Sequence, residues 1–296
     1  MNCKTGLFIK GRALSALFVL ITLLFGCASS RSNRQVKSFH FIQMSDTQFG
    51  MFTDNNGFEK ETANFEKAID AANKLQPAFV IVCGDLVNKT GDTKQIAEYK
   101  RIADKLNKSI PLYNVAGNHD VANKPTKESL DNYRKNFGPD YYSFMQGNLY
   151  GIVLNSSLFF DSTGAPDEAG KQDKWLHQTL EEAKKQKYTN IVIFQHIPWF
   201  LDNLDEKDQY FNIPTSVRQK YIALFQSYGV KYIFAGHLHK NAIGHAKDLE
   251  MITTGPVGKP LGKDPSGFRI VNVNGNVITH HYYGLDSLPL KATTYK

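Results

Sequence analysis

Five apolar runs in this chain each end in a short polar motif, and this pattern limits the folds that the chain can adopt. Residues 39–44, 79–83, 112–116, 191–194 and 232–235 have the length and composition of buried strands. Polar residues at the carboxyl ends of such strands come together at one edge of a sheet. The motifs are Asp46-Thr47-Gln48, Gly84-Asp85, Gly117-Asn118-His119-Asp120, Gln195-His196 and Gly236-His237-Leu238-His239.

Segments with helical periodicity lie between these runs. Residues 58–75 carry apolar side chains near helical spacing, and Pro77 follows, where a helix cannot continue. The same periodicity recurs at residues 93–106, 171–187 and 215–228. Strands that alternate with helices are typical of an α/β core with mostly parallel pairing.

Two further stretches depart from this alternation. Residues 141–155 predict a hairpin that turns at Gly147-Asn148. Near the end of the chain, Asn274-Gly275 is expected as the turn between the last two of three strands, at 251–253, 268–273 and 277–283. We expect these strands to form a second, more antiparallel sheet that packs on the first. Without any internal repeat, residues 38–296 are expected to form one domain.

The first residues have the pattern of a secretory signal. Three basic side chains precede an uncharged run, residues 13–25, which is too short to span a bilayer as a mature helix. Cys27 follows the run, as in the cleavage site of bacterial lipoproteins. We expect residues 1–26 to be removed and residues 27–37 to form a lipidated tether on an exported protein of the cell envelope, at the periplasmic side of the outer membrane. A signal peptide cut later, or an N-terminal anchor helix, is the alternative.

Charge and cysteine content argue against two classes of protein. The chain carries 35 basic and 28 acidic side chains, a net charge of +7 that falls to +4 when residues 1–26 are removed. No dense basic run interleaved with aromatic residues is present, so nucleic acid is not expected as a dedicated partner. Of three cysteines, only Cys83 belongs to the expected domain, which excludes a disulfide framework. Its apolar neighbours favour a small core residue over a nucleophile.

The polar motifs contain the residue types that a pair of metal ions requires. Two adjacent cations need a bridging carboxylate, and Asp85, after a buried strand, is the candidate. Asn118 offers a neutral oxygen, His119 an acid beside the metals, and Asp120 a carboxylate that could fix the imidazole tautomer. A solvated turn at Asp85 and a helix N-cap at residues 117–120 are the alternatives. Four of the nine histidines lie in these motifs, which favours the metal site.

The order of the motifs resembles that of the calcineurin-like metallophosphoesterase superfamily, over residues 38–283. Within it, the likeness is to the calcineurin-like phosphoesterase domain-containing proteins of the complete S-transactivated type. The shared segments are Asp46-x-Gln48-Phe49-Gly50, Cys83-Gly84-Asp85-Leu86, Gln195-His196-Ile197-Pro198 and Gly236-His237-x-His239-x-Asn241-Ala242. The resemblance implies a four-layer αββα sandwich of two mixed sheets flanked by helices. It also implies a metal-dependent hydrolase that cleaves phosphate mono- or diesters by attack of a hydroxide bridging two metal ions.

The resemblance also assigns residues to two divalent ions, which could be Mn, Fe, Mg or Zn. The first ion would take Asp46, Gln48, Asp85 and His239, and the second would take Asp85, Asn118, His196 and His237. His119 would lie near the leaving-group oxygen, with Asp120 behind it.

Two departures from the superfamily bear on activity. Gln48 stands where most members have His, and its harder amide oxygen favours Mn, Mg or Fe. We expect an active site with altered metal preference. Calcineurin-type protein phosphatases carry Arg-Gly after the second motif and Glu after Gly-Asn-His, whereas this chain has Leu86-Val87-Asn88 and Asp120. The chain therefore looks outside that branch.

We expect a monomer that acts on a phosphorylated small molecule or a phosphopeptide. The acidic segment 199–210 and the Gly/Pro-rich segment 255–265 are expected to shape the substrate site, although the former could be a solvated rim. Two rival functions are a metal-binding lipoprotein without turnover that recognises a phosphorylated ligand or partner, and a structural lipoprotein without metal.

Overall fold

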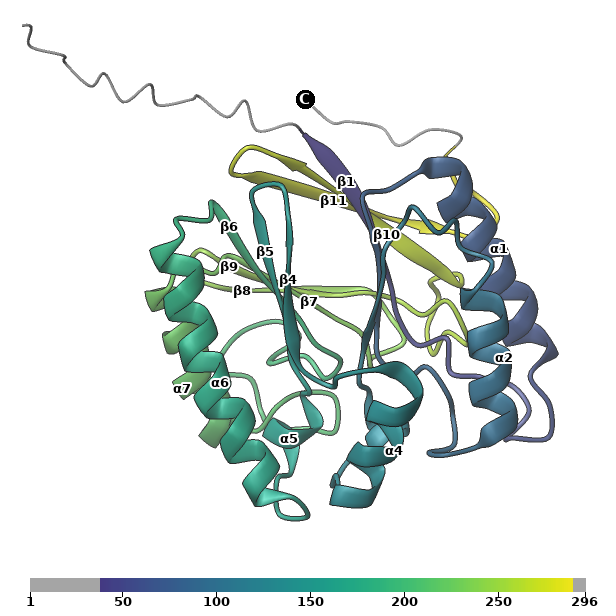
Figure 1. Ribbon diagram of the computed structural model, residues 1–296, viewed down its shortest axis with the longest axis horizontal. Helices are drawn as coiled ribbons and strands as arrows, with labels where there is room; N and C mark the ends of the chain where they lie inside the picture. Colours follow the sequence, from purple (N-terminus) through teal and green to yellow (C-terminus); the bar gives the residue numbers. More distant parts are fainter. Residues whose placement is uncertain (1–37, 290–296) are drawn as a thin grey trace, which may run out of the picture. The chain divides into compact units, whose positions relative to one another are not determined.

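The computed structural model describes residues 38–289, and the expectations for the signal, Cys27 and the tether lie outside this range. Two β-sheets lie face to face, and helices cover the outer side of each (Figure 1). The predicted four-layer sandwich is confirmed. Within residues 38–289, no helix is long and apolar enough to cross a bilayer.

The first sheet has five strands, of which three adjacent ones are parallel. In order across the sheet they are β11 (Val277–Gly284), β10 (Gly267–Asn274), β1 (Phe39–Met44), β2 (Val80–Cys83) and β3 (Leu112–Val115). The strands β1, β2 and β3 are parallel, because helices α1 (Glu59–Leu75) and α2 (Thr93–Ala103) provide the crossovers between them. The antiparallel pair β10 and β11 extends this sheet on the far side of β1.

The second sheet has six strands and is parallel at its centre. Its order is β4 (Tyr142–Gln146), β5 (Leu149–Val153), β6 (Asn190–Phe194), β7 (Tyr232–Ala235), β9 (Leu249–Thr253) and β8 (Ala242–Ala246). The four central strands are parallel, and β4 and β8 are antiparallel edges. Helices α6 (Pro166–Lys185) and α7 (Thr215–Ser227) cover its outer face (Figure 1). The remaining helices are α3 (Asn118–Val121), α4 (Lys127–Phe137) and α5 (Ser157–Phe160).

Several details of the prediction were wrong. The predicted hairpins do not form one antiparallel sheet: β4 and β5 join the second sheet, whereas β10 pairs with β1 in the first. The last turn is Gly275–Asn276 rather than Asn274-Gly275, since Asn274 pairs with Val277. Helix α4 and strand β8 were not predicted. In α4 only Leu130 and Tyr133 are buried, which leaves a weak periodic signal.

Alternate side chains of the central strands build the layers. In β2, Val82 packs in the cluster that contains α1 and α2, whereas Cys83 packs between the two sheets. In β6, Ile193 packs toward α6 and α7, whereas Phe194 packs between the sheets. This alternation is the period of two expected of strands buried on both faces. Burial also raises the pKa of the Cys83 thiol, as expected of a core residue rather than a nucleophile.

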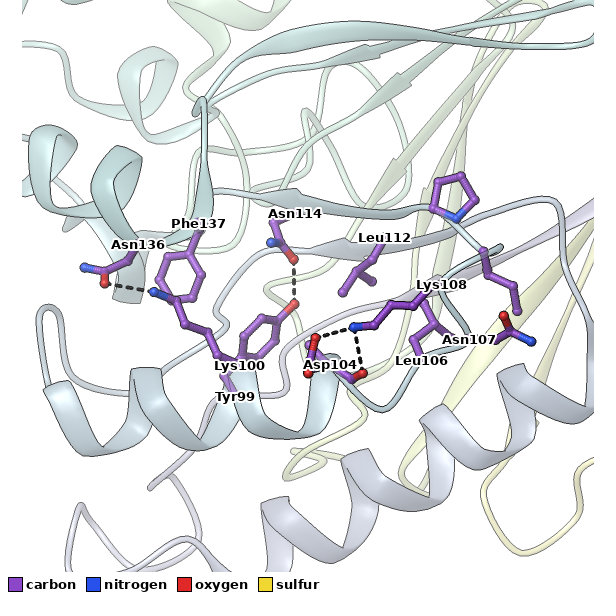
Figure 2. Close-up of a pocket in the computed structure, with 13 residues that line it drawn as sticks. Tyr99, Lys100, Asp104, Leu106, Asn107, Lys108, Leu112, Asn114, Asn136 and Phe137 are labelled. Atoms are coloured by element: carbon purple, nitrogen blue, oxygen red, sulfur yellow. Dashed lines mark hydrogen bonds and ion pairs between the residues drawn. The ribbon is translucent and has the colours of Figure 1, made fainter.

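A cavity of about 550 Å³ lies beside the edge strand β3, where residues of α2 and α4 line it (Figure 2). The Tyr99 hydroxyl donates to Asn114 Oδ1 at 2.6 Å, and Lys100 Nζ donates to Asn136 Oδ1 at 3.1 Å. These four polar side chains therefore bond to one another in pairs, and no residue of the five polar motifs lines the cavity.

Candidate metal centre

The polar motifs meet where the carboxyl ends of strands from both sheets face each other. The first sheet brings Asp46, Asp85 and Asn118, after β1, β2 and β3, and the second brings His196 and His237, after β6 and β7. We expected one edge of one sheet, which was wrong because β6 and β7 pair within the second sheet. His196 Nε2 lies 3.1 Å from Asp85 Oδ2 and 3.0 Å from Asn118 Oδ1, which links the two sheets.

Two groups of buried side chains could each hold a metal ion. One group is Asp46, Asp85 and His239, and the other is Asp85, His196 and His237. The ligand atoms within each group lie within 4.8 Å of one another. Asp85 belongs to both groups, as a carboxylate that bridges adjacent cations must. The arrangement is consistent with a dimetal centre.

Gln48 and Asn118 lie beside these groups, and both carry a neutral side-chain oxygen. The backbone N–H of Gln48 donates to the Asp85 carbonyl at 2.8 Å. The Gln48 side chain is only 1% exposed, yet its Oε1 has no hydrogen-bond partner. An unsatisfied buried oxygen is costly, and a cation at the neighbouring carboxylates would satisfy it. The residues present therefore fit two divalent ions.

Each histidine of the motifs bonds one ring nitrogen to a backbone carbonyl. The bonds join His119 Nδ1 to Asn88 O (2.6 Å), His196 Nδ1 to Cys83 O (2.8 Å), His237 Nε2 to Tyr210 O (3.0 Å) and His239 Nδ1 to Lys259 O (2.6 Å). A carbonyl oxygen can only accept a hydrogen bond, so the ring nitrogen that faces it must carry a hydrogen. When the ring is neutral, its single N–H is therefore at that nitrogen. The other nitrogen keeps its lone pair for a metal ion or a proton.

Asp120 does not take the role that we predicted for it. Its carboxylate accepts hydrogen bonds from the backbone N–H groups of Leu86, Val87 and Gly117, at 2.8 to 3.2 Å, and the imidazole of His119 is held by Asn88 instead. Asp120 thus ties the loop after β2 to the start of α3, close to the helix-cap alternative. Burial and the nearby Asp85 carboxylate raise the pKa of Asp120 to about 8.

The buried charged groups of the site shift one another's pKa values. Burial lowers the pKa of His196, but the adjacent Asp85 carboxylate outweighs burial and raises this pKa to about 9. Burial raises the pKa of Asp85, and the charge of His196 more than reverses this, so the carboxyl group ionises below its usual range. At His237, burial and the neighbouring His196 lower the pKa to about 4. Buried carboxylates need a compensating cation, and divalent ions would take over this role from protonated imidazoles.

The backbone at the site is strained. Among the described residues, eleven non-glycine residues have positive φ, and five of them are predicted ligands: Asp46, Gln48, Asp85, His237 and His239. Each such conformation costs about 1–3 kcal/mol and persists only where the surrounding structure enforces it. The glycines before the motifs allow close approach, since a Cβ at Gly236 would overlap Ser45 Oγ and one at Gly117 would overlap the backbone of Asp85. Strain of this kind clusters at functional sites.

Both predicted substrate loops reach the site, one through the side chain and backbone of Tyr210 and the other through the backbone of Lys259. Tyr210, at the end of segment 199–210, accepts from Asn118 Nδ2 on its hydroxyl at 3.2 Å, and its ring centroid lies 4.9 Å from that of His237. Lys259, in segment 255–265, holds His239. Sequence analysis missed the roles of Asn88, Tyr210 and Lys259, because every residue type offers the same carbonyl. Within the acidic loop, the Glu206 carboxylate accepts hydrogen bonds from the backbone N–H groups of Leu201 and Asp202, so its charge has partners inside the loop.

Comparison with known proteins identifies the family. Residues 39–241 match the family described as Calcineurin-like phosphoesterase. The chain belongs to this family. With its two buried groups of Asp and His, this calcineurin-like phosphoesterase is a metal-dependent enzyme that acts on phosphate esters.

Relatives and solved structures agree with this assignment. The chain is 38% identical over 294 residues to the rat serine/threonine-protein phosphatase CPPED1, covering 94% of this chain and 91% of the rat protein. It is 39% identical over 269 residues to the human protein of that name, covering 86% of each. The fold is similar to a purple acid phosphatase from yellow lupin (TM-score 0.65, 14% identity, 86% of this chain and 53% of that chain). It is also similar to a dimetal phosphatase from Danio rerio (TM-score 0.55, 14% identity, 83% and 99%).

Proposed function

We propose that this calcineurin-like phosphoesterase hydrolyses phosphomonoesters, those of serine and threonine side chains among them. The observation that carries the proposal is the sharing of Asp85 between two buried groups of ligand atoms. The name of the relatives at 38–39% identity supports serine and threonine esters as the substrate class. Absence of the calcineurin-type Arg-Gly segment argues for a substrate site unlike that of the calcineurin branch.

In this proposal the ligands divide as the motifs suggest. The first ion would be held by Asp46, Gln48, Asp85 and His239, and the second by Asp85, Asn118, His196 and His237. When bound, two divalent ions would supply Lewis acidity that polarises the phosphate oxygens and lowers the pKa of a water.

The side chains around the ions hold and orient the substrate. His119 Nδ1 is engaged by the Asn88 carbonyl, so a second proton on this ring resides on Nε2, the atom that can protonate the departing alcohol oxygen. The His119 backbone N–H donates to Asp85 Oδ1 at 2.8 Å, which places this residue next to the shared carboxylate. Tyr210 is 47% exposed beside His237, and we assign it to the wall that contacts the substrate.

Replacing the shared carboxylate tests the function. Purified protein with added Mn²⁺ should release phosphate from p-nitrophenyl phosphate. Asp85→Ala should reduce this rate at least ~100-fold, because the loss of a hydrogen-bond partner of a metal ligand by itself costs about 10- to 100-fold. Asp104→Ala, an exposed aspartate of the α2 terminus, is the matched control with unchanged rate. Activity that survives Asp85→Ala contradicts the proposal. Two bound ions with no turnover on any ester would instead support a protein that only binds phosphorylated ligands.

A substrate panel tests the ester class. We expect faster phosphate release from phosphoserine and phosphothreonine peptides than hydrolysis of bis-p-nitrophenyl phosphate, a diester. A preference for the diester would leave the metal centre in place but refute the proposed substrate.

We also propose that the enzyme is a monomeric envelope lipoprotein, exported through residues 1–26 and anchored at Cys27. The sequence pattern alone supports the export and the lipid anchor, since these residues lie outside the described range. Intact mass of the mature protein should show an acylated Cys27 at the N-terminus. A mature chain that begins elsewhere and lacks acyl groups contradicts it.

A further inference from the structure

Asn88 joins two parts of the proposed centre without belonging to either group of ligands. Its Oδ1 accepts a hydrogen bond from Gln48 Nε2 at 3.2 Å, and its backbone carbonyl accepts the bond from His119 Nδ1 at 2.6 Å. Asn88 lies in the loop after β2, three residues beyond Asp85. One residue thus contacts both the unusual amide ligand and the imidazole proposed as the acid.

A chain of amides continues from Asn88 to helix α2. Asn88 Nδ2 donates to Asn55 Oδ1 at 2.8 Å, and Gln95 Nε2 donates to the same oxygen at 2.9 Å. Gln95, which is 2% exposed, accepts on its Oε1 the backbone N–H groups of Asn88 at 3.0 Å and Lys89 at 2.9 Å. Four side-chain amides, of Gln48, Asn88, Asn55 and Gln95, therefore form one continuous relay.

The relay fixes the orientation of every amide in it. A backbone N–H can only donate, so the Gln95 atom that faces the two N–H groups must be its oxygen. Gln95 then presents nitrogen to Asn55, and the facing atom of Asn55 must be oxygen. That oxygen requires nitrogen from Asn88, which leaves the Asn88 oxygen for Gln48.

The last step decides which atom of Gln48 is left for a metal ion. Since Asn88 presents oxygen, Gln48 must turn its Nε2 toward Asn88. Its Oε1 is then the buried atom without a partner. An amide turned the other way would present N–H groups, which cannot ligate a cation.

We propose that Asn88 is a positioning residue that presents Gln48 to the first metal ion as an oxygen ligand. The inference rests on the proposed two-metal function. It accounts for how glutamine can stand where the superfamily has histidine: an imidazole offers nitrogen on either side, whereas an amide needs a partner that orients it. An oriented amide oxygen also favours hard ions such as Mn²⁺ and Mg²⁺.

Metal binding to the chelator-treated protein tests this inference independently of activity. Titration calorimetry with Mn²⁺ and metal analysis should show two ions per wild-type chain. Asn88→Ala should raise the Kd of one site about 10- to 100-fold, the usual loss when an outer partner of a ligand is removed, and leave the other site within a few-fold. Asn88→Asp, which can still accept from Gln48 Nε2, should retain tighter binding than Asn88→Ala.

A double-mutant cycle separates orientation of Gln48 from general support of the loop. In a Gln48→His background, Asn88→Ala should change the Kd little, because no amide remains to be oriented. Equal losses in both backgrounds, or no loss in either, overturn the inference. Asn73→Ala is the matched control, since its amide also bridges a helix and a loop, through Lys105 and Asn107. A wild-type protein that binds no Mn²⁺ would refute the proposed function itself.

Discussion

At the scale of single residues, backbone carbonyls set the chemistry of the imidazoles. His196 and His239 each direct Nδ1 to a carbonyl and Nε2 to a carboxylate, at 3.1 Å from Asp85 and 3.3 Å from Asp46. His237 uses its Nε2 for the carbonyl instead, so that Nδ1 is left for a metal ion. These carbonyls belong to the main chain. Substituting the side chain of a residue that provides one of them would therefore change the tautomer of the histidine only if the backbone moved.

Asp120→Asn tests the structural role of this carboxylate. The amide would place N–H donors against backbone N–H groups that now bond to Asp120, so we expect the free energy of unfolding to fall by about 1–3 kcal/mol per bond lost. Denaturant unfolding measures this. The kcat toward p-nitrophenyl phosphate of the folded variant should stay within a few-fold of the wild-type value, because Asn88 rather than Asp120 holds His119. A large loss of kcat with unchanged stability would restore Asp120 to a role in orienting His119.

At the scale of elements, the strand ends position the ligands through tight turns. The motif after β7 approaches the motif after β1 so closely that the backbone N–H of His237 donates to both carboxylate oxygens of Asp46, at 3.2 and 3.1 Å. Gly236 makes this approach possible, since any side chain there would overlap Ser45 and Asp46. Two strands of different sheets are thereby held together at their carboxyl ends.

Gly236→Ala should separate these strand ends. We expect weaker Mn²⁺ binding, activity reduced about 10- to 100-fold and a loss of stability, because the new methyl group displaces Asp46. Calorimetric titration and thermal unfolding measure both effects.

Gly170→Ala on helix α6 is the matched control for this substitution. Nothing lies within 4 Å of its added Cβ, and alanine favours a helix by roughly 1 kcal/mol over glycine. It should preserve activity and raise stability slightly. If both variants behaved alike, the close approach at Gly236 would have no special importance.

At the scale of the whole molecule, the centre lies at one end of the interface between the two sheets, and a cluster of aromatic side chains fills the middle of that interface. Phe41 and Phe79 of the first sheet pack with Phe194 and Phe234 of the second across this interface. At the carboxyl ends of the strands, polar groups replace these rings, and Asp85 and His196 face each other there. Metal ions bound between them would bind the folded state only.

Metal removal should therefore destabilise the whole molecule. Saturation of a site at 100 times its Kd adds about 2.7 kcal/mol to the free energy of unfolding, so chelation should lower the thermal midpoint and added Mn²⁺ should restore it. Differential scanning calorimetry measures the shift. Asp85→Ala should respond much less to Mn²⁺, and an equal response in this variant would place the stabilising ions elsewhere.

Local sequence was enough for the elements that carry the site. The runs at residues 39–44 and 232–235 are β1 and β7 to the residue, because apolar strands bounded by glycine and polar motifs are set by neighbours in the chain. The same motifs predicted which residue types could bind metal ions. The turn residues Gly147-Asn148 predicted the hairpin. Helix α4 was not predicted because only two of its residues, Leu130 and Tyr133, are buried, too few to give a clear helical period.

The sequence by itself determined which side chains are available to metal ions and that each follows a strand. Only the tertiary structure decided that they come from two sheets, that Asn88 rather than Asp120 holds His119, and that Gln48 turns its oxygen inward. Strand pairing joins segments that are far apart in the chain, so local sequence does not specify it. A main-chain carbonyl is the same in every residue type, so the sequence does not show which carbonyl holds an imidazole.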